Sequence, residues 1–458
     1  MNVTIIGTGY VGLVSGACFA DFGHTVTCVD KDAAKVERLR AGEVPIYEPE
    51  LDRLIAANQA VGRISFTTDP AEAVGSADVV FLAVGTPSRR GGGHADLTYV
   101  YEAAREVAAL VRGYTVICTK STVPVGTGDE VEAIVAAVAP FADVDVASNP
   151  EFLREGAAIG DFKRPDRVIV GAESSRAVAV MRELYRPLFL NETPILFTSR
   201  RTAELTKYAA NAFLAAKITF INEMADLCEK VGADVQDVAK GMGLDKRIGP
   251  KFLNAGPGYG GSCFPKDTLA LAATANDYAT PVTLVDAVVE ANARRKGRMA
   301  RVIVEAAGGS LANRRVAVLG LAFKPQTDDM REAPSLVIVP ALQKAGATVV
   351  AYDPEAMTEA AKVLDVPFAE GAYEAMKGAD VTVILTEWNE FRALDLERVR
   401  ATMRGDVLVD LRNIYSAETA GRAGLTYRSV GRTDAPLGLP AAHVTGTDLS
   451  DIQGLLKN

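Results

Sequence analysis

Short apolar runs alternate with stretches of helical periodicity over the first part of the chain. A short apolar run bounded by turn residues is typical of a buried strand, and repeated β and α segments predict a parallel sheet with helices on both faces. The strand-like runs are 3–6, 25–29, 79–84, 115–118, 144–147 and 168–171.

The pattern changes near Thr202. From there to Val231 the residues keep helical periodicity and contain no strand-like run. A helix of about 30 residues is about 45 Å long at a rise of about 1.5 Å per residue. Further helical stretches cover 268–277 and 281–307, so this middle part is predicted to be all helix.

A second alternating region begins near Asn313, with strand-like runs at 316–321, 348–352, 381–385 and 407–411 and a helix over 334–345. It repeats the β-α-β-Asp plan of the N-terminus, but Gly320-Leu-Ala-Phe-Lys324 stands where the first copy has a glycine fingerprint. The predicted fold class is therefore α/β, with two Rossmann-like, doubly wound parallel-sheet domains joined by a long central helix.

Composition narrows the function classes. The 458 residues are 48% hydrophobic and 23% charged, which suits two or three globular domains. A net charge of −9 argues against a nucleic-acid partner. The chain has no apolar run near the roughly 18 residues of a membrane span, and its N-terminus reads as a strand rather than a signal. Five scattered cysteines without metal-ligand spacing predict a reduced, cytoplasmic protein with no metal site.

The first glycine-rich segment has the spacing of a dinucleotide loop. Gly7, Gly9 and Gly12 fit G-x-G-x-x-G between a strand and a helix, where they allow a tight turn, close approach of a pyrophosphate and close helix–strand packing. Asp30 ends the next strand, where a carboxylate holds a ribose 2′-hydroxyl and repels a 2′-phosphate. We therefore predict NAD rather than NADP; the alternative is a structural turn with a solvated Asp.

A second glycine-rich loop, GPGYGGSCFPKD over 256–267, surrounds a cysteine. Cys263 is predicted at a helix N-terminus beside Lys266, and both features are expected to lower the pKa of the thiol. Asp267 follows one helical turn later. The alternative is an inert, buried cysteine. None of the three histidines, His24, His94 and His443, sits in a motif with an acidic or nucleophilic partner, so acid–base work falls to Lys, Asp, Glu or water.

Other polar side chains stand near predicted strand ends or on the long helix. Lys207 and Asn211 are four residues apart on that helix, so they share one face. They belong either to a solvated surface or to a site between domains. Glu151, Glu155 and the hydroxyl-rich segment 121–127 follow strands of the first region, and Lys324, Arg331 and Arg412 follow strands of the second. Ligands of open α/β sheets bind at such ends.

These residues, taken in order, resemble the UDP-glucose/GDP-mannose dehydrogenase family, in its UDP-glucose 6-dehydrogenase branch. The resemblance extends to about residue 415. It is carried by the segments GTGYVG, STVPVGT, NPEFLREG, AELTKYAANAF, MGLDKRIGPKFLNAGPGYGGSCFPKD, GLAFKPQTDD-REAPS and DLRNIY.

The resemblance implies an organisation and a reaction. It implies an NAD-binding domain over 1–200, a helical dimerisation region carrying the cysteine loop over 201–308, a UDP-sugar-binding domain over 309–440 and a tail over 441–458. It further implies that a homodimer oxidises C6 of UDP-glucose twice with NAD, through a thiohemiacetal and a thioester on Cys263, to give UDP-glucuronate. A GDP-mannose 6-dehydrogenase is the alternative.

The resemblance also implies roles for residues. Lys207 and Asn211 are expected to stabilise oxyanions, while Asp267, Glu155 or a water on Thr122 handles protons. The expected NAD contacts are Gly7, Gly9, Tyr10, Val11, Gly12, Asp30, Lys35, Thr86, Thr122, Glu155, Cys263, Lys266 and Arg331. The expected UDP-sugar contacts are Glu151, Phe152, Leu153, Lys207, Asn211, Phe252, Gly256, Tyr259, Gly260, Lys324 and Arg412, with Arg247 reaching into the neighbouring subunit's site.

Overall fold

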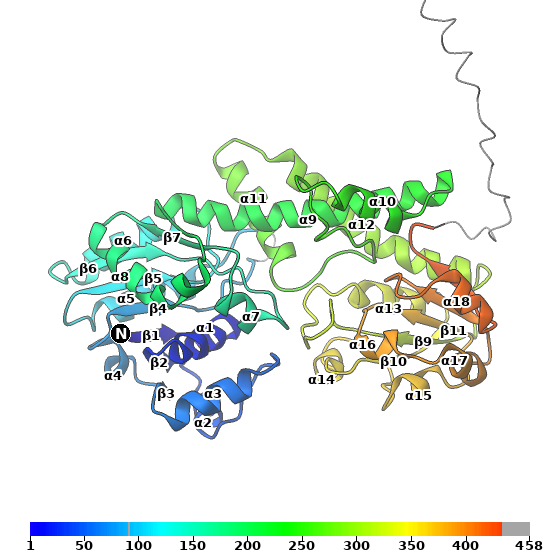
Figure 1. Cartoon of the computed structure of the whole chain (residues 1–458), viewed down its shortest axis with the longest axis horizontal. Coiled ribbons are helices and arrows are strands. Elements are labelled where there is room, and N and C mark those ends of the chain that lie inside the picture. The colour runs from blue at the N-terminus through cyan, green and yellow to red at the C-terminus, as the bar shows by residue number, and fades with distance from the viewer. Residues whose placement is uncertain (90–91, 433–458) are drawn as a thin grey trace, which may run out of the picture.

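The structure is a computed structural model that describes residues 1–89 and 92–432. Two α/β bodies lie side by side, and the long helix α9 (Arg200–Val231) crosses above them (Figure 1). Each body contains one largely or wholly parallel sheet, which confirms the predicted fold class. The predicted tail, 441–458, lies outside the described residues, as does Arg90 of the loop after β4 (Val79–Leu82).

The first body contains an eight-stranded sheet in the order β3-β2-β1-β4-β5-β6-β7-β8. All four residues of β4 are buried, as expected for a central strand covered on both faces. The short strands β3 and β8 were not predicted. The remaining strands are β1 (Asn2–Ile6), β2 (Thr25–Val29), β3 (Ile64–Thr67), β5 (Thr115–Thr119), β6 (Val144–Ser148), β7 (Val168–Ala172) and β8 (Ile195–Thr198).

The sheet departs from the parallel prediction at β7, which pairs antiparallel with β6. The connection between them contains α7 (Ala158–Lys163), which packs against α1 (Tyr10–Asp21). A six-residue helix spans only about 9 Å, too short to carry the chain back along a strand of about 17 Å. The chain therefore enters β7 from the carboxyl end of β6, and the connecting segment 149–157 remains at that edge.

Helices cover both faces of this sheet. One apolar layer includes α1, α2 (Ala33–Arg40), α3 (Leu51–Ala60), α7 and α8 (Ser175–Leu184). The other includes α4 (Pro70–Val74), α5 (Thr98–Ala108) and α6 (Thr127–Val138). In α5 the buried residues recur at three- and four-residue spacing, which gives the helix one apolar face toward the sheet.

Helix α9 begins two residues before the predicted start. Ser199 caps it by accepting a hydrogen bond from the backbone N–H of Thr202, and Gly232 ends it with a φ of +78°. One face buries Glu204, Lys207 and Asn211. Among the described residues, no helix has both the length and the apolar character needed to cross a membrane.

The second body contains a five-stranded parallel sheet in the order β10-β9-β11-β12-β13. Apolar layers lie on both of its faces. Its strands are β9 (Arg315–Leu319), β10 (Thr348–Tyr352), β11 (Val381–Ile384), β12 (Val407–Asp410) and β13 (Thr426–Ser429). The remaining helices are α10 (Val235–Gly243), α11 (Phe264–Asp277), α12 (Thr283–Ala306), α13 (Ser335–Lys344), α14 (Met357–Ala360), α15 (Ala372–Met376), α16 (Asn389–Arg392), α17 (Leu396–Thr402) and α18 (Ala417–Arg422).

The two bodies share one local construction after their first strand. Gly7 has a φ of +102°, and the next N–H, from Thr8, donates to Asp30; Gly320 has a φ of +89° and the next N–H, from Leu321, donates to Asp353. Asp353, however, is fully buried and also accepts from Trp388 and from other backbone N–H groups. Asp353 therefore accepts hydrogen bonds inside the protein, whereas Asp30 is half-buried and directly follows the carboxyl end of β2.

Candidate active site

The glycine loop between β1 and α1 has the geometry of a dinucleotide site. Gly7 turns the chain with positive φ, and a Cβ on Gly12 would lie 2.0 Å from the carbonyl oxygen of Gly7, so helix and loop meet too closely for any side chain. A Cβ on Gly9 would meet nothing within 4 Å. That open side, at the start of α1 before Tyr10 and Val11, fits a pyrophosphate approaching the helix N-terminus.

Asp30 lies beside this loop. Its carboxylate accepts from the backbone N–H of Thr8 at 3.0 Å and from Lys35 Nζ at 3.2 Å. Burial opposes ionisation, but hydrogen bonds from Thr8 and Asp32 outweigh it and lower the pKa of Asp30. The charge at the end of β2 is thus present at neutral pH, where it fits a ribose diol and repels a 2′-phosphate.

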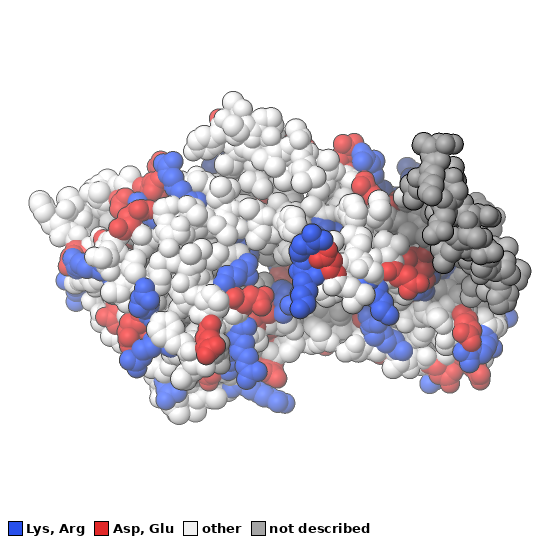
Figure 2. All heavy atoms as spheres, turned by 45° about the horizontal axis from the view of Figure 1, so that its top comes forward, with Lys and Arg blue, Asp and Glu red and all other residues white. Residues whose placement is uncertain are grey.

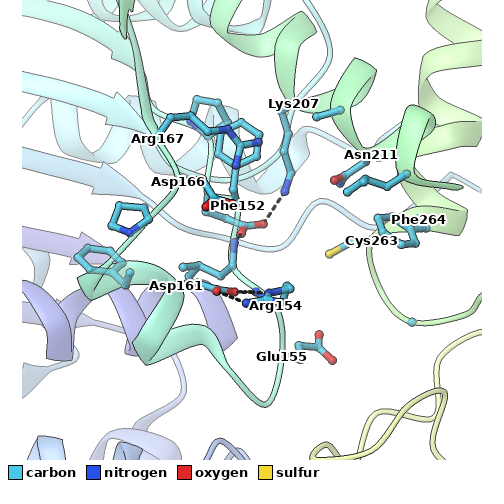
Figure 3. Close-up of a pocket in the computed structure, with 18 of the residues that line it drawn as sticks. Phe152, Arg154, Glu155, Asp161, Asp166, Arg167, Lys207, Asn211, Cys263 and Phe264 are labelled. Carbon is cyan, nitrogen blue, oxygen red and sulfur yellow. Dashed lines mark hydrogen bonds and ion pairs between the residues drawn. The ribbon is translucent and has the colours of Figure 1, made fainter. Parts of the chain in front are cut away.

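A cavity of about 570 Å³ opens between the two bodies. Its walls come from the segment 149–155, the α9 face, the cysteine loop and Phe323-Lys324. Figure 3 shows Lys207, Asn211 and Cys263 directed toward one space, with Glu155 below them. Basic residues of its lining include Arg154, Arg164, Arg167, Lys217, Lys251 and Lys324. Figure 2 shows Lys and Arg side chains, with acidic ones beside them, near the middle of the molecule. The cavity therefore suits an anionic ligand.

Lys207 lies in a buried ion pair, not on a solvated face. Its Nζ is 3.1 Å from Glu151 Oε1, and the two side chains are 3% and 5% exposed. Burial alone would lower the pKa of Lys207, but Glu151, Cys263 and Asp267 outweigh it and raise the pKa. The ammonium group is therefore a fixed positive charge in the cavity wall, able to stabilise an oxyanion.

Asn211 and Asp267 form a second buried pair one turn along α9. Asn211 Nδ2 donates to Asp267 Oδ2 at 2.6 Å, and Lys266 Nζ lies 2.6 Å from Asp267 Oδ1. Asp267 is fully buried on the first turn of α11, one turn after Cys263, as the spacing predicts. Lys266 therefore pairs with Asp267 rather than with the thiol.

Cys263 stands at the N-cap of α11 and is the one half-buried cysteine among the described residues; the other four are buried. The prediction of a lowered thiol pKa is wrong for the free protein. Burial, with Glu151 and Asp267 nearby, raises the pKa of Cys263 to about 11, although Lys207 acts in the opposite direction. Burial is the main cause, and the charge of Glu151, which is distant in sequence, adds to it, while Lys266 is paired with Asp267.

Glu155 joins three parts of the site. Its carboxylate accepts from Ser262 Oγ at 2.9 Å and lies 3.4 Å from Arg331 Nη2, while its carbonyl accepts from Lys324 Nζ at 2.5 Å. Burial and the nearby Asp329 raise the pKa of Glu155 to about 7, so this carboxyl group exchanges a proton near neutral pH.

The predicted sugar-nucleotide residues divide into two groups. Phe152, Leu153, Phe252, Gly260 and Lys324 line the cavity together with Glu151. Four others lie outside its lining. Gly256 and Tyr259 are buried in the loop before Cys263. Arg412 donates to the backbone carbonyl oxygens of Phe323 and Leu385, and Arg247 is 90% exposed and pairs with Asp245.

Thr86 and Thr122 meet at the ends of β4 and β5, where Thr86 Oγ1 donates to the carbonyl oxygen of Thr122 at 3.1 Å. Both residues lie outside the cavity lining, at the carboxyl end of the sheet where the dinucleotide loop also lies. Arg331 is also outside the cavity lining, and it pairs with Asp329 and with the cavity residue Glu155.

Two buried charged residues near the site were not predicted. Lys120 lines the cavity and donates to Asn149 and Tyr185, and burial lowers its pKa to about 8. Lys120 directly follows β5, and a charged residue at the end of a strand could have been predicted as a site residue from the sequence. Glu48 accepts from the backbone N–H groups of Gly156 and Ala158 and pairs with Tyr10. Gly156 and Ala158 lie 108 and 110 residues after Glu48 and Tyr10 lies 38 residues before it, so no local pattern could indicate Glu48.

Within 1–89 and 92–432, no three His, Cys, Asp or Glu side chains gather so as to hold a metal ion. The site brings together a thiol, the buried Lys207–Glu151 ion pair, the buried Asn211–Asp267 pair and the carboxyl group of Glu155, whose pKa is about 7.

Comparison with protein families gives three consecutive matches. The NAD-binding, central and UDP-binding domain models of the UDP-glucose/GDP-mannose dehydrogenase family match residues 1–189, 201–294 and 317–417. The UDP-glucose 6-dehydrogenase of Rhizobium meliloti (strain 1021) is 62% identical over 437 residues, covering 95% of this chain and 100% of that protein.

Solved structures agree with these matches. A UDP-glucose dehydrogenase from Pyrobaculum islandicum superposes with a TM-score of 0.86 at 40% identity, covering 94% of this chain and 97% of that one. A GDP-mannose dehydrogenase from Pseudomonas aeruginosa gives a TM-score of 0.53 at 29% identity, covering 94% of this chain and 99% of that one. The similarity to the UDP-glucose dehydrogenase is higher on both measures.

Proposed function

Because the chain belongs to the UDP-glucose/GDP-mannose dehydrogenase family, we infer that it oxidises UDP-glucose to UDP-glucuronate with NAD. The reaction consumes UDP-glucose, two NAD and one water, and yields UDP-glucuronate, two NADH and the released protons. The main structural support for this reaction is that Cys263 lies at one cavity together with the Lys207–Glu151 and Asn211–Asp267 pairs.

The glycine loop, Asp30 and Lys35 would hold NAD, with Thr86, Thr122 and Arg331 nearer its reactive end. When bound, NAD supplies the acceptor for the hydride removed from C6. The residues of this chain supply the rest. Lys207 and Asn211 stabilise negative charge on the C6 oxygen, and their burial strengthens that interaction because little water screens it.

Cys263 is the covalent nucleophile in this proposal. Once C6 is an aldehyde, the sulfur adds to it, the thiol proton leaves, and the aldehyde oxygen takes a proton to give a thiohemiacetal. Loss of a second hydride and of the hydroxyl proton gives a thioester, and water releases the carboxylate and regenerates the thiol. Because the resting pKa of Cys263 is about 11, attack requires a base; Asp267, Glu155 or a water on Thr122 can fill this role.

The UDP moiety is assigned to the wall of Phe152, Leu153, Phe252 and Lys324. Lys324 Nζ already reaches across from the second body to the carbonyl oxygen of Glu155, so it stands at the boundary of both bodies. The aromatic rings and basic groups of this wall suit a base and a pyrophosphate.

A homodimer is part of the proposal. Phe213, Phe220 and Leu227 recur at seven-residue spacing on α9 and are 67%, 45% and 52% exposed. Such an exposed apolar stripe indicates a protein interface, and Figure 2 shows few charged side chains over α11 and the adjoining part of α9. Arg247 is 90% exposed and pairs only with Asp245 of its own loop among the interactions described, so it would reach the neighbouring site by exchanging that partner. Light scattering tests this: a fully active monomer would contradict it.

We place the enzyme in the cytoplasm, since its five cysteines are unpaired. The test of function is a coupled measurement of NADH and product with UDP-glucose, with GDP-mannose as the matched control. We expect two NADH and one UDP-glucuronate per UDP-glucose and much slower turnover of GDP-mannose. One NADH per sugar, or preference for GDP-mannose, would overturn the proposal.

A further inference from the structure

Helix α6 begins without a side chain of its own to cap it. Its N-cap is Gly126, which has a φ of +94° and no side-chain cap. The free N–H groups at a helix start need acceptors, and a negative charge there is favoured by the helix dipole. In this protein the acceptor comes from another helix, because Glu204 of α9 accepts from the N–H groups of Gly126 and Gly128 at 2.8 Å each.

Glu204 also reaches the end of β6. Its Oε1 accepts from Ser148 Oγ at 2.8 Å, and its side chain is buried. Three residues after Ser148 comes Glu151, the ion-pair partner of Lys207. The loop that leads into α6 contains Thr122, four residues before the N-cap residue Gly126. The Glu204 carboxylate therefore links α9 to two segments that carry site residues: the loop before α6 and the end of β6.

The hydrogen bonds of Glu204 also affect the position of the site residues on α9. Glu204, Lys207 and Asn211 are spaced by three and four residues, so they lie on one face of the helix. Lys207 Nζ is 3.1 Å from Glu151, and Asn211 Nδ2 is 2.6 Å from Asp267. A small slide or rotation of α9 would lengthen both contacts.

We propose that Glu204 is a positioning residue for the oxidation, fixing Lys207 and Asn211 in register with the Thr122 loop and the end of β6. The inference rests on the proposed function, because it assigns those residues to the reaction. Glu204 does not line the cavity and acts through the groups that do.

The chain offers a matched control. Arg200 of α9 pairs with Glu132 of α6 at 2.7 Å, which is a second link between the same two helices. Glu132 is 56% exposed, and Asp129 remains as a partner of Arg200 when Glu132 is replaced. Glu132→Gln therefore removes the same charge as Glu204→Gln and loosens the same helix pair without touching the α6 cap.

The experiment measures kcat and KM for UDP-glucose at saturating NAD for the full-length wild type, Glu204→Gln and Glu132→Gln. A misplacement of about 1 Å costs up to about 100-fold in rate, so we expect kcat of Glu204→Gln to fall about 10- to 100-fold. KM should stay within about threefold, because the wall assigned to UDP is untouched. Glu132→Gln should keep kcat within about twofold of wild type, as for an exposed ion pair.

Gly128→Ala tests the same contact from the other side. A Cβ there would lie 2.9 Å from Glu204 Oε1 and 3.0 Å from Ser148 Oγ, so it displaces the carboxylate without removing its charge. We expect about a tenfold fall in kcat. This variant decides the question if Glu204→Gln does not fold.

Wild-type kcat in Glu204→Gln, or an equal fall in Glu132→Gln, would overturn the positioning role, as would wild-type kcat in Gly128→Ala. A wild-type protein that makes no UDP-glucuronate would instead refute the proposed function, and this inference with it.

Discussion

Replacing Lys207 by methionine tests both the electrostatics and the chemistry of the site. Methionine preserves the length of the side chain and removes its charge. Lys207 and Glu151 are almost fully buried, 3.1 Å apart. Loss of the ammonium group leaves the Glu151 carboxylate in the interior with the N–H of Leu153 as a remaining donor. An uncompensated buried charge is far more costly than a missing surface ion pair.

The expected loss of stability in Lys207→Met follows from the burial of this ion pair. Breaking a buried pair by removing one partner costs about 3–5 kcal/mol of stability. The double variant Lys207→Met/Glu151→Gln removes both charges, and the glutamine oxygen still accepts from Leu153, so most of the loss should be recovered. The catalytic loss is separate: a missing oxyanion donor costs about 100- to 1,000-fold in kcat, and the double variant should not recover it.

The assay combines urea unfolding, followed by fluorescence and circular dichroism, with steady-state kinetics on the wild type, both single variants and the double variant. We expect the unfolding midpoint of Lys207→Met to drop and that of the double variant to return most of the way, while kcat stays low in both. Recovery of kcat together with stability would show that Lys207 acts only through the fold. An unchanged midpoint in Lys207→Met would refute the buried pair.

Three further outcomes follow from the site. Asp30→Ala should raise KM for NAD and relax discrimination against NADP; a wild type that uses both equally would contradict the role of Asp30. Because the pKa of Cys263 is about 11, alkylation by iodoacetamide should accelerate about tenfold per pH unit from pH 7 to 10, and a plateau below pH 8 would be inconsistent with a protonated resting thiol. Glu155 is protonated below its pKa of about 7 and ionised above it, so kcat should show a limb near pH 7 that Glu155→Gln lacks; the same limb in that variant would exclude Glu155 as its source.

The parts of this protein that could be predicted are those encoded locally. The strand, glycine loop, helix and Asp30 are consecutive in sequence, and the spacing of Gly7, Gly9 and Gly12 specifies the turn by itself. The long helix was predicted to within two residues at its start because its periodicity persists over eight turns or so. Strands β3, β8 and β13 have four residues each and little periodic signal, and they were missed.

What could not be predicted depends on contacts between distant residues. The antiparallel pairing of β7 follows from the shortness of α7. The raised pKa of Cys263 results first from burial and then from Glu151, while its neighbour Lys266 pairs with Asp267. The sequence pattern of the α9 face carrying Lys207 is also compatible with a solvated surface; in the structure Glu151 of the first body and the segment from Cys263 to Asp267 bury this face. Glu204 caps a helix 76 residues earlier, which no pattern around Glu204 could indicate.

The central claim is that Cys263 carries the sugar as a covalent thioester, and Cys263→Ser tests it most directly. Serine keeps the shape of the loop but is a poor nucleophile and cannot form the thioester. NADH release with excess UDP-glucose is followed together with intact-protein mass spectrometry of quenched samples. We expect the wild type to yield two NADH per product and a protein mass increased by the UDP-sugar acyl group. We expect the variant to show neither the adduct nor turnover within several orders of magnitude of wild type. A Cys263→Ser protein that still makes two NADH and free UDP-glucuronate near the wild-type rate would contradict the account.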